Sequence, residues 1–90
     1  MNLTIEETRV VATENDVELG EMSFMMPNDD YYIISHTGVS EAAKGKGVGK
    51  TLVAHFVDYA RQHNKKILPL CPFAKAEFEK NEAYHDVLVQ

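Results

Sequence analysis

The sequence predicts an α+β fold, a small domain built on a mixed sheet. Three observations favour it: apolar residues alternate with polar ones along much of residues 3–40, they take up a helical spacing after Val48, and a short apolar run follows at residues 66–70. Alternation indicates strands, and apolar residues three to four positions apart indicate a helix. A chain of 90 residues can bury one modest core, so we expect a single domain over residues 1–90.

The first part of the chain is expected to form a three-stranded antiparallel meander. Residues 3–12 and 17–26 alternate in part, and residues 31–40 are rich in aromatic and β-branched side chains. The alternation slips at Gly20–Glu21, which suggests a β-bulge. Short polar turns separate the three segments, and short connections are typical of antiparallel neighbours.

The second part is expected to hold two helices and one more strand. Residues 66–70 should pair parallel to the strand before the first helix, because a helical crossover joins parallel strands. Pro72 should open a short second helix over residues 72–81, since proline is favoured at the first helical position. The tail after Asn81 fits either a short helix or an edge strand. The first helix should run from about Gly47 to His63–Asn64, with one apolar side made of Val48, Leu52, Val53, Phe56, Val57 and Ala60.

Composition and charge exclude several classes of protein. The net charge of −5 disfavours a general nucleic-acid surface, and no stretch approaches the ~18 apolar residues of a membrane span. The single cysteine rules out an internal disulfide framework, and the N-terminus lacks the basic and apolar segments of a signal peptide. The four histidines show no metal-ligand spacing, so we expect no metal site. We therefore expect a cytoplasmic protein with no nucleic-acid or membrane partner.

The segment Lys44–Lys50, KGKGVGK, concentrates three glycines and three lysines before the predicted helix. A nucleotide-hydrolase phosphate loop would need glycine where Lys44 stands, so the segment is one residue short of that motif. The dinucleotide-binding fingerprint fails as well, because Gly45, Gly47 and Gly49 alternate strictly. Glycines just before a helix N-terminus still allow one small anion to approach the backbone. We predict a phosphate cradle of another kind, with a solvated lysine-rich turn as the alternative.

At this point the residues resemble a known family. The stretch KGKGVG looks like the Arg/Gln-x-x-Gly-x-Gly/Ala loop of the GNAT superfamily of acetyl-CoA-dependent N-acetyltransferases, with Lys44 where arginine or glutamine is usual. HTGVS, KGKGVGKTLV, YAR, LCPF and EFEKN recur in this order in a group of very short GNAT-like proteins, over roughly residues 17–85. That group lacks the early helices that help to form the acceptor pocket in larger GNAT enzymes, and so does this sequence.

The resemblance implies acetyl-CoA as the ligand and a minimal GNAT-like arrangement of the strands. The strands around His36–Ser40 and Lys66–Leu70 would splay apart, and the pantetheine arm of the cofactor would enter the gap between them. The loop amides would hold the CoA pyrophosphate. The cofactor-binding residues implied in this way are Gly38, Val39, Lys44, Gly45, Lys46, Gly47, Val48, Gly49 and Lys50.

Cys71 and His36 are the candidate catalytic residues. Cys71 directly precedes Pro72 and can cap the second helix, where the helix N-terminus can lower a thiol pKa from about 8.5. The resemblance implies that this cysteine faces the thioester and acts as a nucleophile. His36 interrupts an apolar strand and is a candidate base for Cys71 or for an incoming amine. A buried structural cysteine and a structural strand histidine are the alternatives.

Two functions of different classes fit these residues. The first is an enzyme that moves an acetyl group from acetyl-CoA to an amine or other small nucleophile, through an acetyl-Cys71 intermediate or by direct attack. The second is a CoA-binding module without turnover, acting as a sensor or adaptor. The acceptor is not identified by the sequence, and we expect a monomer or a weak homodimer.

Overall fold

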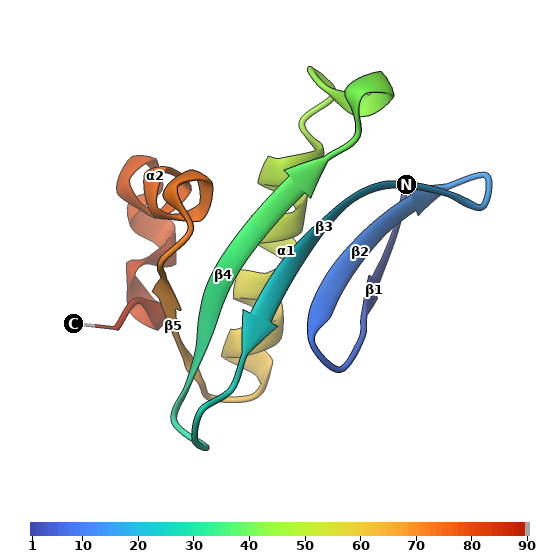
Figure 1. Cartoon of the computed structure of the whole chain (residues 1–90). Helices are drawn as coiled ribbons and strands as arrows, with labels where there is room; N and C mark the ends of the chain where they lie inside the picture. The colour runs from blue at the N-terminus through green and yellow to red at the C-terminus, as the bar shows by residue number, and fades with distance from the viewer. Residues whose placement is uncertain (90) are drawn as a thin grey trace.

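The computed structural model describes residues 1–89 and shows a mixed five-stranded sheet with the strand order β1-β2-β3-β4-β5 (Figure 1). Neighbouring strands from β1 to β4 are antiparallel, and β5 is parallel to β4. The α+β fold and the parallel placement of the last strand are therefore confirmed. The strands are β1 Asn2–Ile5, β2 Arg9–Glu14, β3 Val17–Met25, β4 Tyr31–Val39 and β5 Lys66–Pro69.

The antiparallel part has four strands, which corrects the predicted three-stranded meander. The segment expected as one strand over residues 3–12 folds as the hairpin β1–β2. Its turn is closed by a backbone hydrogen bond of 2.7 Å from the Glu6 amide to the Arg9 carbonyl, and the Arg9 guanidinium donates to the Glu6 carboxylate. The turn residues are exposed and contain no glycine, proline or asparagine. The usual sequence markers of a hairpin are therefore missing there.

Two irregularities in pairing set which side chains face the core. In β3, Ala12 pairs with Gly20 and Thr13 with Glu18, so Leu19 is the extra residue. This bulge lies one residue before the predicted slip at Gly20–Glu21. In β4, Ser35 is the extra residue, because Ser23 pairs with His36 and Phe24 with Ile34. An extra residue changes the alternation of faces along a strand, so the side chains after Ser35 point differently from what strict alternation predicts.

Helix α1, Val48–Gln62, packs behind the sheet against β2, β3, β4 and β5 (Figure 1). All six residues of its predicted apolar side are buried, as is Gly49. The helix ends at Gln62 with His63 as its C-cap, and Asn64, the asparagine expected to stop the helix, adopts a left-handed φ of 57°. The core lies mainly between α1 and one face of the sheet and also includes buried side chains from residues 71–87, and the ring of Phe56 packs against Phe24.

The C-terminal part covers the β5 side of the sheet. Helix α2, Pro72–Lys80, begins at the predicted proline and ends one residue before the predicted Asn81. Of the two alternatives for the tail, the short helix is observed as η2, Glu82–Val87, and the described residues after it make a single isolated parallel bridge from Leu88 to Ile67 of β5. A further short helix, η1 Glu41–Ala43, follows β4.

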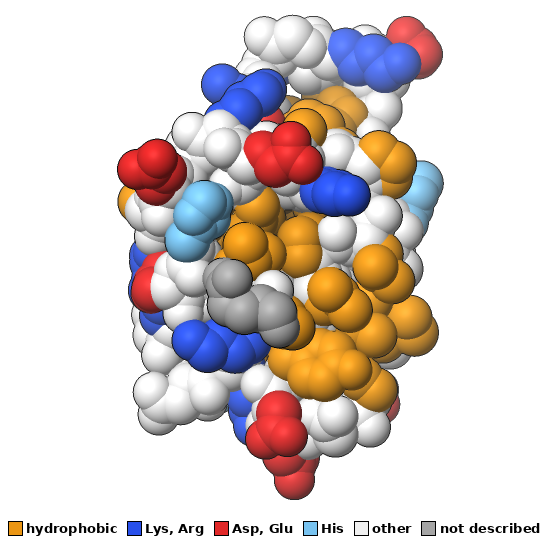
Figure 2. All heavy atoms as spheres, turned by 90° about the vertical axis from the view of Figure 1, so that its left-hand side faces the viewer, with side chains coloured by type: hydrophobic (Ala, Val, Ile, Leu, Met, Phe, Trp, Pro, Cys, Tyr) orange, Lys and Arg blue, Asp and Glu red, His pale blue; other side chains and the backbone are white. Residues whose placement is uncertain are grey.

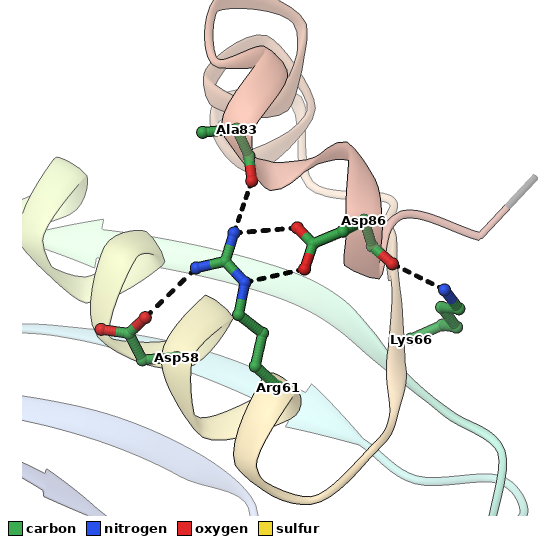
Figure 3. Close-up of polar contacts among 5 residues, drawn as sticks. All are labelled: Asp58, Arg61, Lys66, Ala83 and Asp86. Carbon is green, nitrogen blue, oxygen red and sulfur yellow. Dashed lines mark hydrogen bonds and ion pairs between the residues drawn. The ribbon is translucent and has the colours of Figure 1, made fainter.

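Hydrogen bonds from Arg61 of α1 link the tail to this helix (Figure 3). Its guanidinium donates two hydrogen bonds of 2.8 Å to the Asp86 carboxylate, a third of 3.3 Å to Asp58, and another to the Ala83 carbonyl. Lys66 of β5 donates to the Asp86 carbonyl at 2.6 Å. Hydrogen bonding from Arg61 holds the pKa of Asp86 below its ordinary value of 3.8. The ionised carboxylate therefore stabilises the folded chain, as a group with a depressed pKa does.

We expect Asp86→Asn to lower the free energy of unfolding at about pH 7 and to have less effect at about pH 3. The contribution of a carboxylate with a lowered pKa is present above its unfolded value and is lost as the pH falls through the folded value. Urea unfolding of both proteins at the two pH values measures this difference. Asp16→Asn, at an exposed turn residue, is the control and should leave the pH dependence unchanged. An equal loss for Asp86→Asn at both pH values would contradict the assignment.

Candidate active site

The strands β4 and β5 part at Ile34. Tyr31–Ile34 pair with Lys66–Pro69, and then both the Leu70 and the Cys71 amides donate to the Ile34 carbonyl, at 3.0 and 3.1 Å. Strand β4 continues to Val39 beside β3, while the chain after β5 turns away into α2 (Figure 1). Within residues 1–89, no strand pairs with residues 35–39 of β4 on this side. The free edge of β4 agrees with the resemblance, whereas Lys66–Pro69, implied to lie along the gap, are paired with Tyr31–Ile34 and the chain diverges only after them.

Cys71 lies at the point where the two strands part. It is the N-cap residue of α2, as predicted, and Pro72 is the first helical residue. The side chain is buried, and its Sγ lies 3.5 Å from the Oγ1 of Thr37 on β4. The thiol therefore closes the inner end of the gap between β4 and α2.

The surroundings of Cys71 favour the thiolate. Burial is the largest single influence and raises the pKa of the thiol. It is outweighed by the Thr37 hydroxyl and by the backbone amides of Ala74, Phe73 and Thr37, so the pKa of Cys71 lies below its ordinary value. The two helix amides belong to the first turn of α2, where unsatisfied N–H groups and the helix dipole favour a negative charge. A larger thiolate fraction makes a better nucleophile at neutral pH.

Thr37 is the residue that sequence analysis missed. It stands between His36 and Gly38, both of which were singled out. Which of the three faces α2 depends on the extra residue Ser35, and nothing in the local sequence marks that bulge. Threonine is β-branched and common in strands, so the sequence gives no sign that Thr37 has a role beyond forming the strand.

The structure does not bring His36 to Cys71. Successive side chains of a strand point to opposite faces, and Thr37 is the one that contacts the thiol. His36 is exposed on the open face of the sheet, away from α1. Its Nε2 lies 3.2 Å from where a Cβ on Gly38 would be, so the imidazole lies along the strand over that glycine. A shallow pocket of about 260 Å³ beside it also includes Glu18 and Glu21.

The predicted cradle lies at the far end of β4. Gly45 and Gly47 have left-handed φ values of 85° and 75°, a conformation that glycine adopts readily, and a Cβ on either would meet no atom within 4 Å. Gly47 is the N-cap of α1 and has no side chain to cap it. The first-turn amides of Val48, Gly49 and Lys50 therefore lack an intrahelical acceptor.

The three loop lysines are not equivalent. Lys44 pairs with Glu41 at 3.0 Å, so part of its charge is neutralised. Lys46 and Lys50 are exposed, and the described part of the chain offers them no carboxylate within ion-pair distance. Lys50 also lines a polar pocket of about 470 Å³ between α1 and the C-terminal end of α2, together with Glu77 and Lys80. The positive charge available at the loop thus comes mainly from two lysines.

Gly49 has a packing role that its place in the glycine pattern does not reveal. A Cβ at this position would lie 2.7 Å from the Cζ of Phe73, closer than real Cβ contacts come. The missing side chain lets the Phe73 ring reach the first turn of α1. The glycine at position 49, which the sequence analysis assigned to the cofactor loop, is therefore also explained by its packing against Phe73.

A mainly apolar groove lies elsewhere, on the outer side of β5. It has a volume of about 500 Å³ and is lined mainly by apolar residues of β5, α2 and the tail, including Leu68, Leu70 and Phe78. Figure 2 shows hydrophobic side chains gathered on this face. Cys71 does not line the groove, so we place the candidate site in the gap, where the thiol lies.

Among residues 1–89, neither the length nor the hydropathy of any helix suffices for a membrane span.

The chain combines a mixed sheet, in which β4 and β5 diverge, with a glycine loop after β4 and a helix behind the sheet. The profile of the GCN5-related N-acetyl-transferase family matches residues 8–87. The chain therefore belongs to the GCN5-related N-acetyltransferase family, which confirms the resemblance seen in the sequence and its assignment to the N-acetyltransferases.

Solved structures support the same assignment. A GCN5-like protein from Staphylococcus aureus, named for an N-acetyltransferase function, is 34% identical, with a TM-score of 0.78 over 98% of this chain and 87% of that one. Rv2747 from Mycobacterium tuberculosis, in complex with CoA, is 22% identical, with a TM-score of 0.65 over 82% of this chain and 46% of that one. An acetyltransferase from Clostridium acetobutylicum, solved with acetyl-CoA, is 17% identical, with a TM-score of 0.58 over 80% and 54%. The last two share the fold alone. The comparison with curated proteins found no match.

We expect Thr37→Val to make Cys71 less reactive, because valine keeps the shape of threonine and removes the hydroxyl that stabilises the thiolate. The rate of thiol alkylation at neutral pH should fall about threefold, the size expected for one hydrogen bond, and its pH midpoint should rise. Alkylation by iodoacetamide across a pH series measures both. Thr4→Val on β1 is the control and should match the wild type. An unchanged alkylation midpoint in Thr37→Val would show that the Thr37 hydroxyl does not stabilise the Cys71 thiolate.

Proposed function

We propose that this chain moves an acetyl group from acetyl-CoA to an amine or another small nucleophile, and that Cys71 carries the acetyl group between them. The observation that carries the proposal is the thiol of Cys71, buried where β4 and β5 part and 3.5 Å from Thr37. The lowered pKa of this thiol supports a nucleophile. Membership of the family supports acetyl-CoA as the acetyl donor.

In this proposal the loop and the β4 edge bind the cosubstrate. The first-turn amides of α1 and the charges of Lys46 and Lys50 suit a pyrophosphate, because a helix N-terminus offers both unsatisfied donors and partial positive charge. The free edge of β4 around Gly38 and Val39 suits the amide groups of the pantetheine arm. Bound acetyl-CoA would supply an acetyl group activated as a thioester.

The transfer through cysteine balances without any other reagent. The Cys71 thiolate forms a bond to the acetyl carbon, and the bond between that carbon and the CoA sulfur breaks, with CoA leaving as its thiolate. The exchange replaces one thioester by another, so alignment and activation are the main requirements. The acceptor amine then attacks the acetyl-Cys71 carbonyl and loses a proton, and the Cys71 thiolate is regenerated.

Direct attack of the amine on acetyl-CoA is the second route. His36 remains the candidate base for it, because its imidazole lies on the open face of the sheet, which no helix among residues 1–89 covers. Glu18 and Glu21 border the same pocket, although both already pair with Arg9. In this route Cys71 has a structural role. In the non-catalytic alternative, a CoA-binding module, neither residue is needed for transfer.

Mass spectrometry after mixing the protein with acetyl-CoA tests the proposal. We expect a mass gain of one acetyl group on the peptide that contains Leu70-Cys71-Pro72, and transfer of that group to amines added later. Cys71→Ala should bind acetyl-CoA and show no adduct. Full transfer by Cys71→Ala, with no adduct in the wild type, would favour direct attack. Binding of acetyl-CoA with no transfer to any amine would favour the non-catalytic module.

We expect Gly47→Val to weaken CoA binding by at least about tenfold, because a side chain would stand between the α1 amides and a phosphate. Valine at a φ of 75° also strains the backbone, so stability should fall as well. Asn64→Val is the matched control, since it places the same residue at a φ of 57° at the opposite end of α1. Calorimetry with CoA measures both variants. Equal affinities in Gly47→Val and the control would place the phosphate away from this helix.

A further inference from the structure

The first turns of α1 and α2 meet at a contact between Gly49 and Phe73. An added Cβ on Gly49 would lie 2.7 Å from Cζ and 2.8 Å from Cε2 of the ring. The Phe73 ring thus occupies the space that any other side chain at position 49 would need. The ring is 39% exposed, so it bridges the two helix N-termini at the surface and is not part of the buried core.

Backbone conformation does not explain the glycine at position 49. The glycines with left-handed φ in the described chain are Gly45 and Gly47, and Gly49 lies within the regular helix α1. Alanine favours a helix more than glycine does. The feature that explains glycine here is the ring that lies against it.

The same phenylalanine is linked to the thiol through the main chain. Phe73 follows Cys71 by two residues, and its amide is one of the groups that stabilise the thiolate. A phenylalanine side chain has only two torsions, so the position of its ring constrains its backbone. The second constraint on the thiol is Thr37, 3.5 Å away on β4. The thiol is therefore held between β4 on one side and, through Phe73, α1 on the other.

We propose that Gly49 and Phe73 form a positioning pair, which holds the N-terminus of α2 against the N-terminus of α1 and so sets the place of the Cys71 thiol relative to the glycine loop. The meaning of the pair for acetyl transfer rests on the proposed function. The placement of the thiol does not, because it is a property of the protein without ligand. In this view the third glycine of the loop acts on the cysteine, 22 residues away in the sequence (71 − 49).

The pH profile of Cys71 alkylation by iodoacetamide tests the pair in Gly49→Ala, Phe73→Leu and the double variant. The rate near neutral pH, divided by the high-pH plateau, should fall roughly fivefold in Gly49→Ala, which is less than the roughly tenfold or more expected for complete loss of a hydrogen bond to a charged group, because the amide is displaced and not removed. The midpoint should move to higher pH in each single variant. Adding Gly49→Ala to Phe73→Leu should change the ratio by less than about twofold, because the smaller side chain leaves room for the new methyl group.

Phe78→Leu is the matched control, since it makes the same substitution in the same helix at a side chain that is only 1% exposed. It should lower the melting temperature more than Phe73→Leu does and leave the midpoint of alkylation unchanged. A wild-type midpoint in folded Gly49→Ala would overturn the proposal. If Gly49→Ala does not fold, equal midpoints in Phe73→Leu and Phe78→Leu would overturn it.

Calorimetry with acetyl-CoA separates this proposal from the proposed function. Failure of the wild type to bind acetyl-CoA would disprove the proposed function, but it would not affect the positioning pair, which the alkylation profiles test without ligand. If the wild type binds, Gly49→Ala should retain CoA affinity more fully than it retains formation of acetyl-Cys71. A selective loss of CoA affinity, with a wild-type alkylation profile, would instead assign Gly49 to the phosphate cradle alone and overturn the pair.

Discussion

The parting of β4 from β5 at the Ile34 carbonyl is the constraint on which the candidate site depends. Helix α2 begins at Pro72, three residues after the last residue of β5, so the chain leaves the direction of the strand at this point. The Leu70 and Cys71 amides share a single acceptor as a result. A ladder that continued here would pair the edge of β4 with protein and leave no opening beside the thiol.

The rest of the fold holds that opening in place with only a few elements of structure. One helix, α1, covers one face of the sheet, and its buried side supplies much of the core. The tail is attached to the end of α1 and to β5 through Arg61, Asp86 and Lys66, which secures the side of the molecule that carries α2. Thus β4 and α2, the two walls of the gap, are each supported by contacts with α1.

Elements with a clear apolar periodicity could be predicted from the sequence. The residues whose side-chain positions depend on strand pairing could not. The apolar spacing of α1, the proline at the start of α2 and the run at β5 each carry their information locally. The hairpin turn at Glu6–Thr8 was missed because its residues carry no turn chemistry. Thr37 was missed, and His36 was placed near Cys71, because the bulge at Ser35 exists only when β4 pairs with β3. The role of Gly49 depends on a ring 24 residues further along the chain (73 − 49), which no local pattern reveals.

The left-handed glycines of the loop also bear on the entropy of ligand binding. Backbone hydrogen bonds from Lys44 to Glu41 and from Lys46 to Ala43 hold the segment before α1, and Gly45 and Gly47 supply the turns between them. These contacts order the loop in the chain without ligand. Ordering a flexible segment on association opposes binding, and a segment that is already ordered avoids that loss. In the proposed complex with CoA, a loop that is already ordered would reduce this loss for a small protein with few basic side chains.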